Sequence, residues 1–139
     1  MKAVHVAVER RPIRERCVAD RAHSRAREAA AAVAQGASGA LLTRDVAGIE
    51  SAARFLVPDT LAALQRTAVA WRDALTMTQV VGVTGNVGKS TTKLITAAVL
   101  TVRYRVQVNE ANYNNEIGVP LCLLELRPET ERAVIEMGM

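Results

Sequence analysis

The sequence predicts an α/β protein in which a parallel sheet, connected by crossover helices, carries a phosphate-binding loop and is preceded by a partial α/β unit. From residue 79 onward, short apolar runs alternate with helical stretches in the order strand, helix, strand, helix, strand, and parallel strands need such crossovers. A glycine-rich loop at residues 85–88 joins the first of these strands to the first helix. Half of the 139 residues are hydrophobic but only 3% are aromatic, so the core is expected to be aliphatic.

The first part of the chain predicts one helix and two short strands. Residues 22–35 form an alanine-rich run that predicts a helix, and Gly36 follows as a residue that readily takes the left-handed conformation at a helix end. The short apolar runs at residues 40–43 and 55–57 predict strands. An alternating run at residues 3–8 is a further strand candidate, which arginines and a proline soon interrupt.

A second helix is predicted over residues 60–74, because Asp59 is a good N-terminal cap and directly follows Pro58. Apolar residues recur along it at three- and four-residue steps, which favours a face packed against a core over a cofactor site. The residues of this face are Leu61, Leu64, Ala68, Trp71 and Leu75. The break Thr-Met-Thr at residues 76–78, with its two polar threonines, then predicts a boundary between two partial domains, residues 1–76 and residues 77–139.

The second part of the chain predicts the sheet that carries the loop. Its expected strands are residues 80–83, 104–108 and 133–136, and its expected helices are residues 89–100 and 117–126. The run 80–83 is wholly apolar, which is typical of a strand buried on both faces. Pro120 falls in the first turn of the second helix, where its missing N–H does little harm. An asparagine-rich loop at residues 109–115 precedes that helix.

The charge distribution of the chain argues against a nucleic-acid partner. The net charge is +4, and arginines are concentrated near the start. They are Arg10, Arg11, Arg14, Arg16, Arg21, Arg25 and Arg27. Such a cluster is either an arm for an anionic surface or a solvated face. We favour the solvated face, because no aromatic side chains interleave with the arginines as stacking platforms.

Cysteine usage and hydropathy favour a cytoplasmic protein without a membrane partner. Cys17 and Cys122 are far apart, and with only two histidines there is no metal-ligand spacing. Cys122 lies in an apolar run and is expected to be a small buried residue. No apolar stretch is long enough for a membrane span, and the start of the chain has no continuous apolar run typical of a secretory signal.

The residues most informative about function are those from Thr84 to Thr91, which follow a predicted strand and open a predicted helix. Glycines let several backbone N–H groups point at phosphate oxygens, and the helix N-terminus adds partial positive charge. Lys89 can reach the terminal phosphates, and the Ser90 hydroxyl can bind the Mg²⁺ that bridges them. The loop therefore predicts a site for ATP or GTP with Mg²⁺, formed by Gly85, Asn86, Val87, Gly88, Lys89, Ser90 and Thr91.

The loop is shorter than the eight-residue form of the phosphate-binding motif. Val83 stands where that form has its first glycine, so what remains is G-x-x-G-K-S. The alternative interpretation is a plain glycine turn that begins a helix. The position of the loop between a strand and a helix favours phosphate binding over that alternative.

Three segments in this order resemble the Mur ligase family and its folylpolyglutamate synthetase relatives. The segments are the loop at 84–91, the asparagine run Asn-Tyr-Asn-Asn-Glu-Ile-Gly-Val-Pro at 112–120, and the run Ala-Val-Ile-Glu-Met-Gly-Met at 133–139. The asparagine run resembles the family members that add D-alanyl-D-alanine to a UDP-N-acetylmuramoyl tripeptide. A weaker resemblance over residues 28–75 implies the end of the family's substrate-binding N-terminal domain, so residues 77–139 would belong to its central ATP-binding domain.

The resemblance implies an ATP-dependent amide ligase that works through an acyl phosphate. It implies catalytic roles for Lys89 and Glu136, with Glu136 and Ser90 as Mg²⁺ ligands. The alternative interpretation of Glu136 is a surface residue at the end of a strand. Glu116 is a second candidate for a functional carboxylate, with an exposed residue at a helix start as its alternative. Asn114 and Asn115 are candidates for substrate binding, although asparagines also favour turns for local reasons.

Two departures from the family pattern shape the functional expectation. The loop carries Val87 and Ser90 where relatives usually carry a small polar residue and threonine; Ser90 keeps the hydroxyl. The chain is much shorter than a three-domain ligase, so we expect a fragment, a monomer, with no ligase turnover alone. Alternatives left open are a non-catalytic nucleotide-binding remnant and a folylpolyglutamate synthetase-like ligase. The family's partners are the small molecules UDP-muramoyl peptide and D-alanyl-D-alanine.

Overall fold

A computed structural model describes residues 25–47, 49, 53–110 and 113–138, and the side chains from residue 29 onward within these ranges. The chain forms two compact units that divide between Gln65 and Arg66. The strand expected at residues 3–8 and the arginine cluster lie outside the described residues or side chains. No helix of the described part is long and apolar enough to cross a membrane.

The first unit contains a helix and two parallel strands. Helix α1 (Arg25–Ala34) ends before Gly36, whose φ of 101° is the left-handed conformation predicted for it. Strands β1 (Gly39–Leu42) and β2 (Ala53–Leu56) pair in parallel. The core of this unit consists of the buried residues Ala29, Ala40, Leu42 and Ile49. The elements expected here are confirmed, with shifts of one or two residues at the ends that lie within the described residues.

Helix α2 (Thr60–Ala74) has the bounds that its cap and its apolar spacing predict. The Asp59 carboxylate accepts hydrogen bonds from the N–H groups of Leu61 and Ala62 at 2.8 and 3.0 Å. These N–H groups have no partner within the helix, so the cap stabilises its first turn. The division between the two units lies inside this helix, and the domain boundary predicted at residues 76–77 stays a prediction.

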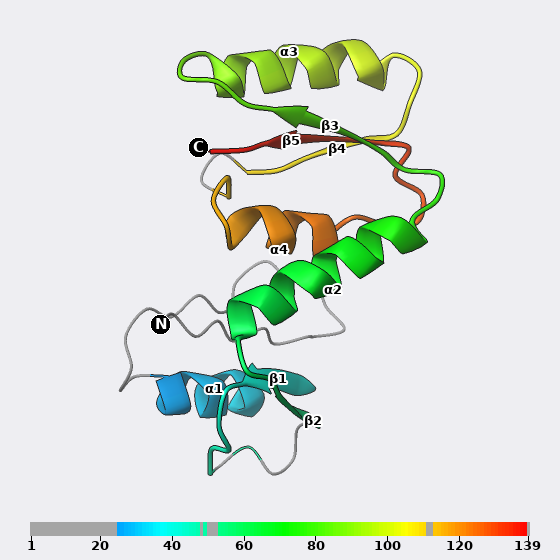
Figure 1. Ribbon diagram of the computed structural model, residues 1–139. Coiled ribbons are helices and arrows are strands. Elements are labelled where there is room, and N and C mark those ends of the chain that lie inside the picture. Colours follow the sequence, from blue (N-terminus) through cyan, green and yellow to red (C-terminus); the bar gives the residue numbers. More distant parts are fainter. Residues whose placement is uncertain (1–24, 48, 50–52, 111–112, 139) are drawn as a thin grey trace. The chain divides into compact units, whose positions relative to one another are not determined.

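The second unit is a three-stranded parallel sheet with a helix on each face (Figure 1). Its strands are β3 (Gln79–Val83), β4 (Val106–Val108) and β5 (Arg132–Glu136), in the order β3-β5-β4. Helix α3 (Lys89–Thr101) connects β3 to β4, and helix α4 (Gly118–Leu124) lies between β4 and β5 in sequence. The predicted α/β class with crossover helices is confirmed.

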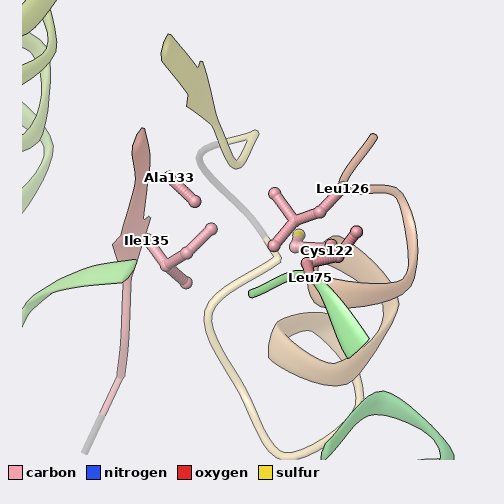
Figure 2. Packing of buried hydrophobic residues seen from close by; sticks show 5 residues of the cluster. All are labelled: Leu75, Cys122, Leu126, Ala133 and Ile135. Atoms are coloured by element: carbon pink, nitrogen blue, oxygen red, sulfur yellow. The ribbon is translucent and has the colours of Figure 1, made fainter. Parts of the chain in front are cut away.

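The central strand β5 has two buried faces with different neighbours. Ala133 and Ile135 pack with Leu75, Cys122 and Leu126 in one cluster, on the α4 side (Figure 2). Val134 packs in another cluster with Val83, the last residue of β3, and with Ala97 of α3. Because side chains alternate along a strand, Glu136 faces the same side as Val134, which is the side of α3. The burial of Cys122 agrees with its predicted role as a small hydrophobic residue.

Two expectations about the strands were wrong in part. Strand β3 is not buried on both faces: Val80 and Gly82 are exposed, because β3 is an edge strand of the sheet. Strand β4 begins at Val106 rather than Tyr104. The N–H of Tyr104 donates to the Leu100 carbonyl at the end of α3, at 2.9 Å, so residue 104 still belongs to the turn that follows the helix.

Candidate nucleotide-binding site

The glycine loop lies between the carboxyl end of β3 and the start of α3, as the sequence predicts. Gly85 and Gly88 have φ angles of 143° and 77°, in the region that favours glycine. A β-carbon built on either residue would meet nothing within 4 Å. Backbone conformation therefore requires glycine at these positions, whereas packing does not. The space beside both residues is open, which suits a loop that a phosphate group approaches closely.

The start of α3 has the groups that an anion needs. Gly88 is its N-terminal cap residue, and no side chain of the described residues caps the helix there. The Lys89 ammonium group donates to the Gly85 carbonyl at 2.7 Å, so the side chain folds back over the loop. Asn86 and Val87 are exposed, Val87 by 93%. Free N–H groups, the helix dipole and one lysine thus converge on the loop.

Glu136 is held beside this loop by the register of the sheet. Its partner across the β3–β5 ladder is Val83, the last residue of β3. The Ser90 hydroxyl donates to Glu136 Oε2 at 2.8 Å, and the Asn114 amide donates to Oε1 at 3.0 Å. The Lys93 ammonium lies 3.5 Å from Oε2, and both side chains of this ion pair are 4% exposed. Serine, asparagine and lysine therefore surround one buried carboxylate.

These contacts keep the carboxylate ionised. The pKa of Glu136 is lowered from its ordinary value, first by the Ser90 hydrogen bond and then by the Asn114 hydrogen bond, while burial opposes the shift. Hydrogen bonds to the charged form and a nearby cation both favour it. The alternative interpretation of Glu136 as a strand-end surface residue is wrong, because the residue is 3% exposed.

The residues present fit a magnesium ion that is shared with a nucleotide. Mg²⁺ prefers oxygen ligands and is commonly held by one or two carboxylates together with phosphates and water. Ser90 and Glu136 offer a hydroxyl and an ionised carboxylate within 2.8 Å of each other. In the described ranges no group of three or more histidine, cysteine or acidic side chains could hold a metal. Phosphate and water oxygens would be further ligands of a metal ion held by these two side chains.

The structure separates the two asparagines that were candidates for substrate binding. Asn114 contacts Glu136 directly, as described above. The Asn115 side-chain oxygen instead accepts hydrogen bonds from the N–H groups of Ile117 and Gly118, at 3.1 and 2.7 Å, and so stabilises the turn that leads into α4. Its oxygen thus has a local structural role. Glu116 is exposed at the same turn.

Two buried residues of the site were not predicted from the sequence. Lys93 is 3% exposed and donates to the main-chain carbonyl of Asn109 at 2.7 Å, and Asn109 itself is 4% exposed. Lys93 follows Lys89 by one helical turn, a spacing that places both on the side of α3 that faces the sheet. That spacing was the available signal. Asn109 belongs to the predicted asparagine-rich loop, but the sequence did not distinguish it from the other asparagines of that loop.

Comparison with known proteins identifies the family. Residues 83–139 match the Mur ligase middle domain. The chain is 50% identical over 109 residues to the UDP-N-acetylmuramoyl-tripeptide–D-alanyl-D-alanine ligase of Synechocystis sp., a match that covers 78% of the chain and 24% of that protein. The chain belongs to the Mur ligase family.

Other Mur ligases with the same name or fold agree with this result. The Bacillus subtilis UDP-N-acetylmuramoyl-tripeptide–D-alanyl-D-alanine ligase is 51% identical over 90 residues, which covers 65% of the chain and 20% of that protein. A MurF ligase structure from Thermotoga maritima in complex with ADP superposes with a TM-score of 0.63 and 33% identity, covering 77% of the chain and 24% of its own. The chain spans about a quarter of the length of the relatives it matches.

A solved structure from Acinetobacter baumannii also has a similar fold. It is a UDP-N-acetylmuramoylalanyl-D-glutamyl-2,6-diaminopimelate–D-alanyl-D-alanyl ligase. Its TM-score is 0.77 at 32% identity, and the match covers 88% of the chain and 27% of that structure. The Mur ligase fold thus extends beyond the middle-domain match into the first half of the chain.

Proposed function

We propose that this chain provides the nucleotide-binding part of an ATP-dependent amide ligase that adds D-alanyl-D-alanine to a UDP-N-acetylmuramoyl tripeptide. The observation that carries the proposal is the contact of 2.8 Å between Ser90 and the ionised Glu136, directly beside a glycine loop that opens a helix. The substrates in this proposal are those that the names of the relatives give. As part of this proposal, the reaction takes place in the cytoplasm, and the protein acts as a monomer on small molecules, without a nucleic-acid or membrane partner.

The loop residues from Gly85 to Thr91 would hold the phosphates of ATP. Their N–H groups and the helix dipole bind the anion, and Lys89 leaves the Gly85 carbonyl to reach the terminal phosphate. Ser90 and Glu136 would hold Mg²⁺, which when bound neutralises charge on the phosphates. Asn114 keeps Glu136 Oε1 hydrogen-bonded and so orients the carboxylate. Substrate contacts of Asn114 and Asn115 stay a prediction.

The proposed reaction has two steps. An oxygen of the substrate carboxylate attacks the γ-phosphorus of ATP, the bond to the bridging oxygen breaks, and ADP leaves with its electron pair. The amine of D-alanyl-D-alanine then attacks the acyl carbon, phosphate leaves, and the amine loses a proton. In the first step Lys89 stabilises the charge that develops on the transferred group, because a fixed cation in a site with little water is worth more than one in solution.

Nucleotide binding is the direct test of the site. Isothermal titration of ATP with Mg²⁺ into the chain should show binding, and Lys89→Ala should remove it. Lys2, which lies outside the described residues, offers a matched control, and Lys2→Ala should bind as the unmodified chain does. Absence of binding in the unmodified chain would refute the proposed site.

A chimaera tests the ligase reaction itself. Residues 79–138 of this chain would replace the matching segment of the Bacillus subtilis relative, and ADP formation would be followed with both substrates. We expect turnover that Glu136→Gln lowers at least about a hundredfold, since electrostatic groups at such sites are typically worth that much. A folded chimaera without turnover would contradict the proposal, as would a Glu136→Gln chimaera with full activity.

A further inference from the structure

The buried side chain of Asn109 has hydrogen bonds that a neighbouring strand would otherwise supply. The regular pairing of β4 with β5 ends at Val108 and Val134. Beyond it, the Asn109 side-chain oxygen accepts from the N–H of Glu136 at 2.7 Å, and its amide donates to the Glu136 carbonyl at 3.0 Å. A primary amide has the same donor and acceptor as a peptide group. Asn109 therefore continues the hydrogen bonding to β5 beyond the end of the ladder, up to Glu136.

The same amide closes the loop that leads to α4. Its nitrogen also donates to the Tyr113 carbonyl at 2.9 Å, so both of its hydrogens have main-chain acceptors. The side-chain amide of the next residue, Asn114, donates to Glu136 Oε1 at 3.0 Å, and its main-chain carbonyl accepts from the N–H of Gly138 at 2.5 Å. Asn109 thus fixes the position from which Asn114 reaches the carboxylate.

The main chain of Asn109 holds a third neighbour of the carboxylate. Its carbonyl accepts from the Lys93 ammonium at 2.7 Å, and that ammonium lies 3.5 Å from Glu136 Oε2. Of the three side chains that approach the carboxylate, only Ser90 is independent of Asn109. The backbone of Glu136 and two of its three polar neighbours are therefore held through one residue.

We propose that Asn109 is a positioning residue for the metal site, an inference that rests on the proposed function. It holds the Glu136 carboxylate in the direction that places Oε2 beside Ser90, so that the hydroxyl and the carboxylate form a ready pair of oxygen ligands. Residues that orient a metal ligand affect metal affinity although they do not touch the metal. A merely structural role for Asn109 would instead affect only the stability of the chain.

The test measures how much Mg²⁺ strengthens ATP binding. ATP is titrated into the chain once with excess Mg²⁺ and once with EDTA, and the ratio of the two dissociation constants gives the coupling between metal and nucleotide. Asn109→Asp keeps the shape of the side chain but places an oxygen against two carbonyl oxygens. We expect the coupling to fall by about tenfold to a hundredfold. Affinity in EDTA should fall only as far as the added negative charge repels the phosphates, since Lys89 and the loop are unchanged.

The sign of the charge makes this variant informative. Asn109→Asp adds a negative charge near the metal site, which alone would strengthen cation binding. A lower coupling therefore reports displaced ligands rather than altered charge. Asn109→Leu adds no charge, is expected to show the same fall, and serves as the second variant if Asn109→Asp does not fold. Thermal unfolding of each variant establishes that it is folded at the temperature of the titration.

Thr130→Val is the matched control. Thr130 is a buried polar residue, 6% exposed, near the opposite end of β5, and its hydroxyl lies 3.1 Å from Gln107 Oε1. Its loss should lower stability and leave the coupling unchanged. The inference is overturned if both Asn109 variants keep the coupling of the unmodified chain within about twofold, or if Thr130→Val lowers it equally. Absence of ATP binding by the unmodified chain is a different result, which overturns the proposed function and the inference with it.

Discussion

The buried ion pair between Lys93 and Glu136 is the contact whose loss we expect to destabilise the second unit most. The charged atoms are 3.5 Å apart, and each side chain is 4% exposed. At an effective dielectric constant of about 20, the attraction at this distance is about 5 kcal/mol. Removing one partner of such a pair typically costs about 3–5 kcal/mol, because the other charge stays buried and unpaired. Lys93→Met keeps most of the side-chain volume and should therefore cost about 4 kcal/mol.

Trp71 allows this prediction to be measured. It is the single tryptophan of the chain, and its indole N–H donates to the Leu126 carbonyl at 3.0 Å, so its fluorescence reports the packing of the second unit during urea unfolding. The double variant Lys93→Met with Glu136→Gln leaves no buried charge. Its loss of unfolding free energy should therefore be smaller than the sum of the losses of the two single variants, by more than about 1 kcal/mol. Lys89→Met, one turn earlier and partly exposed, is the control. A cost below about 1 kcal/mol for Lys93→Met, or additive effects within about 0.5 kcal/mol, would refute the reasoning.

Three further predictions concern stability. Gly88→Ala should cost about 1–2 kcal/mol from backbone strain alone, since its φ is 77° and a β-carbon there meets nothing within 4 Å; urea unfolding measures it, and a cost near zero would mean that the left-handed conformation is not kept. Asp59→Ala should lower stability by about 1 kcal/mol through loss of the α2 cap, and helix content followed by circular dichroism during thermal unfolding tests it. Burial raises the pKa of Cys122 from 9.0 to about 12, so the unfolded thiol ionises first and stability should fall as the pH rises above 9. At pH 10 the loss is about 1.4 kcal/mol, and Cys122→Val should lack this part of the pH dependence.

Local signals predicted the helices well because the interactions that define them are close in sequence. A cap residue and a repeating apolar face determined α2, and the cap interaction spans three residues. The glycine loop and α3 were predicted on the same basis. At Gly36 the left-handed conformation follows from the absence of a side chain. In each case the physical cause lies within a few residues of the feature.

The arrangement of the strands was not predictable in this way. Nothing within β3 indicates that β5 rather than β4 lies beside it, because the two strands are separated by about fifty residues. The expected burial of Val80 failed for that reason: whether an apolar strand is central or at an edge depends on its neighbours. The site shows the same limit. Ser90 and Glu136 were identified as a pair by resemblance, whereas Lys93 and Asn109 became visible only when α3 and the end of β4 met β5.

The alternation of β5 explains why the fold and the site depend on the same contacts. Ala133 and Ile135 face the core beside α4, whereas Val134 and Glu136 face α3. A slip of one residue in register would turn Glu136 into the apolar cluster and Ile135 towards the loop. The apolar core therefore opposes such a slip at the middle of the strand, and the hydrogen bonds of Asn109 oppose it at the end. Because both act on one strand, the position of the carboxylate is set by the packing of the whole unit rather than by the loop beside it.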